Sequence, residues 1–288
     1  MQFAMLTLAA VLIAVDFSIS KQYQKKAGTT PAAGFRFSAI QGLFTMVIFF
    51  FINGCKFSFS WYSFALAAVL NTLCITYTLL GFRIMRYGSM ALYTMFLMTG
   101  GMTLPYLYGL CFLDEPFSVL RTVALVMIIG GVILSNFSNE KINPKQIVMC
   151  FAVFFLNGFV SIVSKIHQIE TIHMTVSAAE FVMLGGIFKI LFAGILYLIT
   201  KKNIPNNERI TTIKILPFVL FSALAGGISY LFQLLGAVSL PATVLYPFIT
   251  GGGIIFSTLA GKIVFREKLS KKLIVSVLLC FAGTIMFL

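Results

Sequence analysis

The chain has 288 residues, of which 59% are hydrophobic and only 10% are charged. With a mean hydropathy of +1.00, this balance lies far outside that of soluble globular domains and indicates an integral membrane protein. The net charge of +13 does not indicate a nucleic-acid partner, because the basic residues stand at the ends of apolar segments, where they mark topology and contact lipid headgroups.

Apolar segments follow one another along the chain, each close to the ~20 residues that a helix needs to cross a bilayer. Because each segment is apolar on all sides, helices and not the alternating strands of an outer-membrane barrel must satisfy the backbone in lipid. Ten spans are predicted, at residues 3–20, 33–53, 61–81, 89–111, 117–137, 145–164, 176–199, 212–235, 241–264 and 270–288. The sequence therefore predicts an all-α membrane protein without a soluble domain.

The second half of the sequence repeats the first. At an offset of 152, matching positions include Phe96 and Phe248, Gly100 and Gly252, Gly101 and Gly253, Gly109 and Gly261, Glu115 and Glu267, and Gly131 and Gly283. At an offset of 144 they include Ser20 and Ser164, Lys21 and Lys165, and Gly42 and Gly186. Since the repeated unit holds an odd number of helices, the second copy must enter the membrane from the opposite side. We predict two inverted five-helix repeats, residues 1–138 and 139–288, in one membrane domain.

Positive charge is distributed unevenly between the connections. Of the 21 lysines and arginines, 17 lie beside the odd-numbered connections, three beside the even ones, and Lys189 lies in mid-span. The positive-inside rule then places the odd connections in the cytoplasm and both chain ends outside.

Two sets of five helices, the glycine pairs Gly100-Gly101 and Gly252-Gly253, and the stretches LDEPFS and FREKLS before a glycine-containing helix resemble the drug/metabolite transporter superfamily, specifically its EamA-like ten-helix members. The resemblance covers essentially the whole chain. It implies a secondary transporter or exporter of small metabolites with the substrate path between the two halves, and we expect a bacterial cytoplasmic membrane. It also implies that both chain ends are cytoplasmic, opposite to the charge count.

Lys189 is the most expensive residue in the sequence, because insertion of a lysine near the bilayer midplane costs about +2.5 to +3.5 kcal/mol. It is either a cation that faces a central cavity, binding a carboxylate or phosphate or carrying a proton, or a structural residue that is neutral or paired with Glu180 or Asp16. Asp16 lies four residues before the end of the first predicted span. Relatives of the four-helix branch exchange protons at an acidic residue in that helix, but deeper; the alternative is a partner for Lys21.

Arg36 and Glu180 occupy equivalent positions of the two repeats with opposite charge. They are read either as a structural pair or as a gate at a cavity mouth, and with Asp16 they form the predicted coupling or gating set. Glu115 and Glu267 are expected to be structural, at helix boundaries beside the caps Ser118 and Ser270.

Uncharged polar and aromatic residues complete the candidates, and together they favour a wet cavity of mixed lining. The predicted substrate-binding set is Lys189, Asn157, Asn71, Tyr77, Tyr230, Gln233, Tyr93 and Tyr246. Small residues at four-residue spacing and prolines predict close helix packing and bends. The predicted packing and hinge set is Gly100, Gly101, Pro105, Gly109, Pro247, Gly252, Gly253, Ser257 and Gly261.

Motifs for ATP-driven or zinc-dependent chemistry are absent: there is no GxxxxGK[ST] and no HExxH, and His167 and His173 are expected in a loop. The five cysteines are scattered, so no metal or cofactor is expected, and the chain is predicted not to be an enzyme. We predict a secondary transporter that moves a small organic metabolite, for example an amino acid or other carboxylate-bearing compound, by alternating access. A coupling proton or ion, the lipid bilayer and a second copy of the chain are candidate partners. The alternatives are a multidrug efflux transporter and a membrane-embedded lipid-modifying enzyme or accessory subunit.

Overall fold

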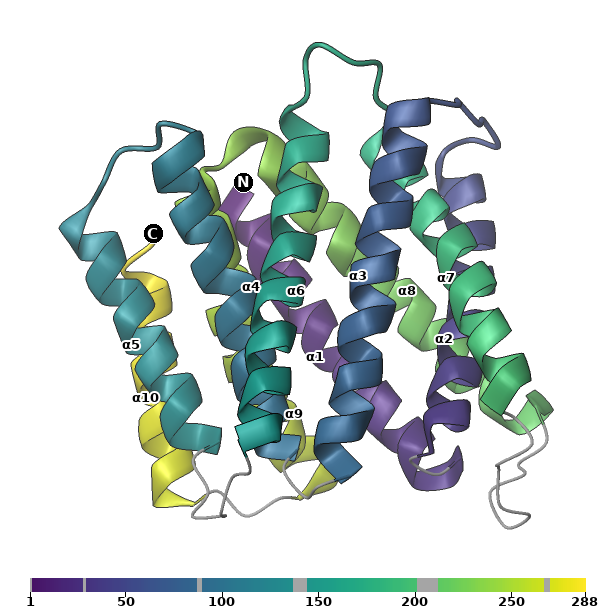
Figure 1. The fold of residues 1–288 in the computed structure, drawn as a ribbon. Helices are drawn as coiled ribbons and strands as arrows, with labels where there is room; N and C mark the ends of the chain where they lie inside the picture. Colours follow the sequence, from purple (N-terminus) through teal and green to yellow (C-terminus); the bar gives the residue numbers. More distant parts are fainter. Residues whose placement is uncertain (1, 28–29, 87–89, 137–143, 201–211, 267–269) are drawn as a thin grey trace.

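The computed structural model describes residues 2–27, 30–86, 90–136, 144–200, 212–266 and 270–288. These residues form ten helices and no strand (Figure 1). The helices are α1 (Gln2–Ala27), α2 (Pro31–Ile52), α3 (Trp61–Arg86), α4 (Met90–Phe112), α5 (Val119–Asn136), α6 (Pro144–Ile169), α7 (Ala178–Thr200), α8 (Thr212–Ser239), α9 (Ala242–Phe265) and α10 (Lys271–Ile285).

Eight helices in the described part of the chain are long and apolar enough to cross a membrane. The other two, α5 and α10, have 18 and 15 residues and pack against each other at one edge of the bundle (Figure 1). The prediction of an all-helical membrane protein is thus confirmed, with eight helices that meet the length expected for a span.

Four helices, α1, α3, α6 and α8, extend at least four residues beyond their predicted C-terminal ends. α1 continues to Ala27 and α6 to Ile169, because the polar residues after each apolar segment are good helix formers that can continue the helix into the interface. Asp16 therefore lies 11 residues before the end of α1, deeper than predicted. His167 lies within α6 and is buried, so the expectation that it lies in a loop is wrong.

The bundle has two edges and a centre. α2 packs against α7 at one edge and α5 against α10 at the other, while α1, α3, α4, α6, α8 and α9 lie between them (Figure 1). Both chain ends lie at the same face as the connections α2–α3, α4–α5 and α6–α7 (Figure 1).

Glycines let the central helices approach closely. A Cβ added to Gly100 of α4 would lie 2.1 Å from the Phe154 carbonyl oxygen of α6, and one added to Gly252 of α9 would lie 2.9 Å from Cβ of Ala10 in α1. A Cβ on Gly109 would meet the Glu115 side chain at 2.6 Å.

The rest of the predicted packing set falls inside α4 and α9. Pro105 lies within α4 and Pro247 within α9. In α9, the Ser257 hydroxyl donates to Ile254 O of its own helix at 3.1 Å. Gly261 is buried, and its carbonyl accepts the N–H of Arg266, the C-cap of α9.

Candidate functional site

A cavity of about 320 Å³ lies at the centre of the bundle. Three helices of the first half, α1, α3 and α4, and three of the second half, α6, α8 and α9, form its wall. Its lining is Ile13, Phe17, Tyr77, Leu97, Met98, Gly101, Asn157, Val160, Ser161, Ser164, Tyr230, Gln233, Leu234, Tyr246, Ile249, Thr250, Gly253 and Ile254. None of these side chains carries a charge.

Five members of the predicted substrate-binding set line this cavity: Tyr77, Asn157, Tyr230, Gln233 and Tyr246. They come from four different helices, and the tertiary structure brings them to one place. Gly101 and Gly253, predicted as packing residues, also form part of the wall.

Polar contacts tie α6 to α4 at the cavity wall. Asn157 Nδ2 donates to Leu97 O at 2.7 Å, and the Ser161 hydroxyl donates to Gly101 O at 3.1 Å. A Cβ on Gly101 would lie 2.5 Å from Asn157 Nδ2. Glycine at this position is therefore what allows the Asn157 amide to reach the backbone of α4.

Two tyrosines are oriented by hydrogen bonds from the second half of the chain. The hydroxyl groups of Tyr230 and Ser164 are 2.8 Å apart, and the Tyr246 hydroxyl donates to Ser161 O at 2.6 Å. Because both phenols are held by α6, their positions in the cavity depend on that helix.

Sequence reasoning missed Ser161 and Ser164. The signal was present, because Asn157, Ser161 and Ser164 follow one another at intervals of four and three residues and so share one face of α6. Thr250 was missed as well, although it lies between Pro247 and Gly252, two positions of the predicted packing and hinge set.

Three predicted substrate-binding residues do not line the cavity. Lys189 lies halfway along α7, which faces α2, and its Nζ donates to Gln41 Oε1 at 3.2 Å. Asn71 is buried and donates to Ala67 O of its own helix at 2.8 Å. Tyr93 packs over Gly81, where an added Cβ would lie 2.6 Å from its ring. The structure therefore places these three outside the cavity lining, and their contact with a substrate stays a prediction.

Asp16 and Lys189 are connected through two side chains that sequence reasoning missed. Gln41 Nε2 donates to Ser222 Oγ at 2.8 Å, and the Ser222 hydroxyl donates to Asp16 Oδ1. Lys189 therefore lies in the polar surroundings of Asp16 and outside the cavity lining. This position favours the structural interpretation of Lys189 over a cation that faces the central cavity.

Arg36 and Glu180 lie at opposite ends of the α2–α7 pair. Arg36 is in the second turn of α2, whereas Glu180 accepts from Ser58 N, beyond the end of α2, at 2.7 Å and from Ser177 N at 2.9 Å. The 21 residues between Arg36 and Ser58 include 16 helical residues of α2, which extend over about 24 Å. A direct pair between Arg36 and Glu180 is therefore excluded, and Glu180 caps α7 in a capping box with Ser177.

Glu115 is structural, as predicted, but it caps a different helix. Its carboxylate accepts from Ala242 N at 2.6 Å and Thr243 N at 2.9 Å, at the start of α9. Ser118 and Ser270 cap α5 and α10 by accepting from Arg121 N and Leu273 N. Glu267 lies outside the described residues.

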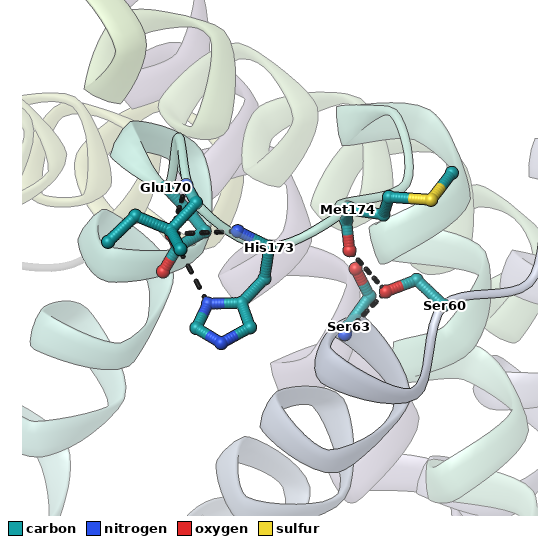
Figure 2. A network of polar contacts seen from close by, with 6 residues as sticks. Ser60, Ser63, Glu170, His173 and Met174 are labelled. Carbon is teal, nitrogen blue, oxygen red and sulfur yellow. Dashed lines mark hydrogen bonds and ion pairs between the residues drawn. The ribbon is translucent and has the colours of Figure 1, made fainter.

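A second polar group lies away from the cavity, between the α6–α7 connection and the start of α3 (Figure 2). Glu170 accepts from Ile172 N at 2.7 Å and His173 N at 3.2 Å, and the Ser60 hydroxyl donates to Met174 O. The hydrogen bond from Tyr62 and these two backbone N–H groups lower the pKa of Glu170 to about 2. These contacts fix the path of the α6–α7 connection against the start of α3.

No group of histidine, cysteine, aspartate and glutamate side chains in the described residues could hold a metal ion. No protein-family model matches the chain, and no curated protein matches it. A solved structure named only "Crystal structure of protein" has a similar fold, with a TM-score of 0.75 and 13% sequence identity over 98% of this chain and 95% of that chain. At this identity the similarity establishes the fold alone.

Proposed function

We propose that the protein is a secondary transporter that moves a small uncharged organic solute by alternating access between two inverted five-helix repeats. The observation that carries the proposal is the central cavity, whose wall combines α1, α3 and α4 with the helices predicted to be their repeat equivalents, α6, α8 and α9. A binding site at the interface of inverted repeats near mid-membrane is the arrangement that alternating access uses.

Reciprocal contacts between α2 and α7 support the inverted repeat. A Cβ on Gly42 would lie 2.7 Å from Gly186 O and 3.0 Å from Ile190 N, and one on Gly186 would lie 2.8 Å from both Gly42 O and Met46 N. Gly42 and Gly186, like Met46 and Ile190, are 144 positions apart. Exchange of equivalent partners is what a two-fold axis between two copies requires.

The α5–α10 pair provides the same evidence at the other edge of the bundle. A Cβ on Gly131 would lie 2.8 Å from Ser276 O, and one on Gly283 would lie 2.7 Å from Ala124 O. Here the equivalent positions are 152 apart. Both edges of the bundle thus support one pseudo-two-fold axis.

The cavity itself favours an uncharged solute with a polar side and an apolar side. Its lining contains no charged side chain, and Lys189, the reason to expect a carboxylate-bearing compound, lies elsewhere. α6 contributes Asn157 and Ser161 where the equivalent positions of α1 contribute Ile13 and Phe17. The volume is at the lower end of the roughly 300–1,000 Å³ of small-molecule sites.

The alternatives receive less support from this arrangement. Efflux of cationic drugs predicts an acidic residue in the cavity, but neither Asp16 nor Glu180 lines it. A lipid-modifying enzyme predicts a lateral groove at headgroup depth, whereas this cavity is central. A place in the drug/metabolite transporter superfamily, which the sequence resembles, is part of the proposal.

The proposal is tested with Gly253→Leu, because a Cβ at Gly253 meets only Ile13, at 3.7 Å, and a longer side chain enters the cavity. Purified protein is screened with small neutral solutes by thermal-shift stabilisation, and hits are tested for uptake into proteoliposomes. We expect Gly253→Leu to abolish both stabilisation and uptake while the unfolding midpoint without solute stays near that of the unaltered chain.

Gly194→Leu is the control, because nothing lies within 4 Å of a Cβ at Gly194; it should retain uptake. Uptake that is unchanged in Gly253→Leu, or the absence of uptake of every stabilising solute, would contradict the proposal.

A further inference from the structure

Outside the cavity, four side chains form one continuous hydrogen-bonded chain across α7, α2, α8 and α1. Lys189 Nζ donates to Gln41 Oε1 at 3.2 Å, Gln41 Nε2 donates to Ser222 Oγ at 2.8 Å, and the Ser222 hydroxyl donates to Asp16 Oδ1. Every donor points from Lys189 towards Asp16. The chain therefore has a positive end and a negative end, with two neutral dipoles aligned between them.

These residues lie deep in the membrane-spanning part. Each is at least ten residues from either end of its helix. Because an isolated charge at such depth is expensive, opposite charges joined by oriented dipoles stabilise each other there. The hydrogen-bonded side chains also connect two tightly packed helix pairs, α1–α8 and α2–α7.

A carboxylate at this depth needs a positive partner. Without a fixed one, Asp16 would take a proton or a metal cation from water. The Ser222 oxygen that contacts Asp16, and the Gln41 oxygen that Lys189 Nζ contacts further along, are ligands of the kind that hard cations prefer. In this structure the positive charge comes from the Lys189 ammonium, at the other end of this series of hydrogen bonds.

We propose that the Lys189 ammonium is a tethered cation that occupies the electrostatic role of a coupling proton or Na⁺ at Asp16. Asp16 then remains ionised without binding any cation from water. Removal of Lys189 unmasks a monovalent-cation site formed by Asp16, Ser222 and Gln41. One consequence rests on the transport proposed above: solute movement does not require a cation gradient at Asp16.

The test uses thermal unfolding of the purified full-length chain in detergent, which does not depend on transport. Midpoints are compared in NaCl and in choline chloride of equal ionic strength at pH 8, and in choline chloride at pH 8 and pH 6. The variants are Lys189→Met, Asp16→Asn and the double variant. A cation that binds only the folded protein raises the midpoint by mass action.

We expect the unaltered chain to respond like Asp16→Asn. Lys189→Met should gain several degrees from Na⁺ or from the lower pH, and Na⁺ and proton occupancy are distinguished by which condition produces the gain. The double variant should lose that gain. The other titratable groups on helices packed against α1 include Tyr230, Tyr246, Arg36 and Lys262, and the Asp16→Asn comparisons separate their response from that of Asp16.

Two results would overturn the inference. One is a Na⁺ or acid response of the unaltered chain that Asp16→Asn abolishes, which would show that Asp16 binds a cation from water beside Lys189; this result decides the matter even where Lys189→Met does not fold. The other is a folded Lys189→Met that responds to neither condition. Neither result bears on solute uptake, and a failure of uptake leaves these midpoints unaffected.

Discussion

Lys165 and Glu115 hold the two sides of one turn, the connection between α8 and α9. Lys165 Nζ donates to Ala237 O and Leu240 O, both at 2.7 Å, while Glu115 accepts from the N–H groups of Ala242 and Thr243. A cation at the C-terminus of one helix and an anion at the N-terminus of the next both interact favourably with the helix dipoles. Because α8 and α9 both line the cavity, this turn fixes the relative position of two of its walls.

Glu115→Gln should therefore destabilise the protein, by about 1–2 kcal/mol, the range of a lost charged N-cap. The measurement is the unfolding midpoint in detergent. Asp114→Asn is a matched control, because Asp114 is the adjacent acidic residue, is exposed, and has a φ of 51° that asparagine tolerates. Equal effects of the two substitutions would show that the capping contact is not what stabilises the turn.

Gly186→Ala should destabilise the α2–α7 interface by about 1–3 kcal/mol, because the new methyl group meets two backbone atoms at 2.8 Å. Gly194→Ala in the same helix should be neutral or stabilising, since the added Cβ has nothing within 4 Å and alanine favours helix. Unfolding midpoints of the two variants give the comparison. A Gly186→Ala protein as stable as Gly194→Ala would mean that the helices are not in close contact at this point.

Tyr230→Phe should weaken solute binding, because it removes a hydroxyl group from the cavity lining, and it should lower the unfolding midpoint about as much as the control, because it also removes the 2.8 Å contact to Ser164. A lost hydrogen bond of about 1 kcal/mol corresponds to roughly a five-fold rise in KM for uptake. Tyr23→Phe is the control, since the Tyr23 hydroxyl donates to Ala33 O outside the cavity lining. It should lower the unfolding midpoint and leave KM unchanged; the reverse pattern would place the solute elsewhere.

Cysteine labelling tests the orientation predicted by the charge count. Cys55 is exposed, in the connection between α2 and α3, which that count places outside. In a Cys111→Ser background, a membrane-impermeant maleimide should label Cys55 in intact cells. The buried Cys150 and Cys280 should react only after denaturation. Labelling of Cys55 that requires permeabilised cells would reverse the orientation, as the family resemblance implies.

Glu170 predicts a pH dependence in the acid range. Its pKa is lowered to about 2 in the folded protein by Tyr62 and the N–H groups of Ile172 and His173, so its carboxylate stabilises the fold above the ordinary carboxyl pKa. That stabilisation is lost as pH falls towards 2. The difference in midpoint between the unaltered chain and Glu170→Gln should be constant from pH 7 to pH 5 and shrink below about 4.5. A difference that persists unchanged at pH 3 would contradict this origin.

The helical membrane architecture was predictable because hydropathy and helix length are local properties of a segment. The polar residues that meet in the cavity were partly predictable for the same reason: Asn157, Tyr230 and Gln233 are costly in lipid wherever they lie, so their presence in apolar segments indicates an interior position. Their costs identify them one at a time, but not which of them share a site.

Which residues each charged side chain contacts was decided only by the tertiary structure. Lys189 was recognised as an unusual charge, yet the sequence could not say that α7 pairs with α2, which turns Lys189 towards Gln41 and away from the cavity. Arg36 and Glu180 match in the alignment of the halves but lie at opposite ends of an antiparallel pair. Composition and periodicity describe what each helix needs to bury, whereas the contacts that satisfy it depend on which faces meet, and that is set by packing among all ten helices of the described chain.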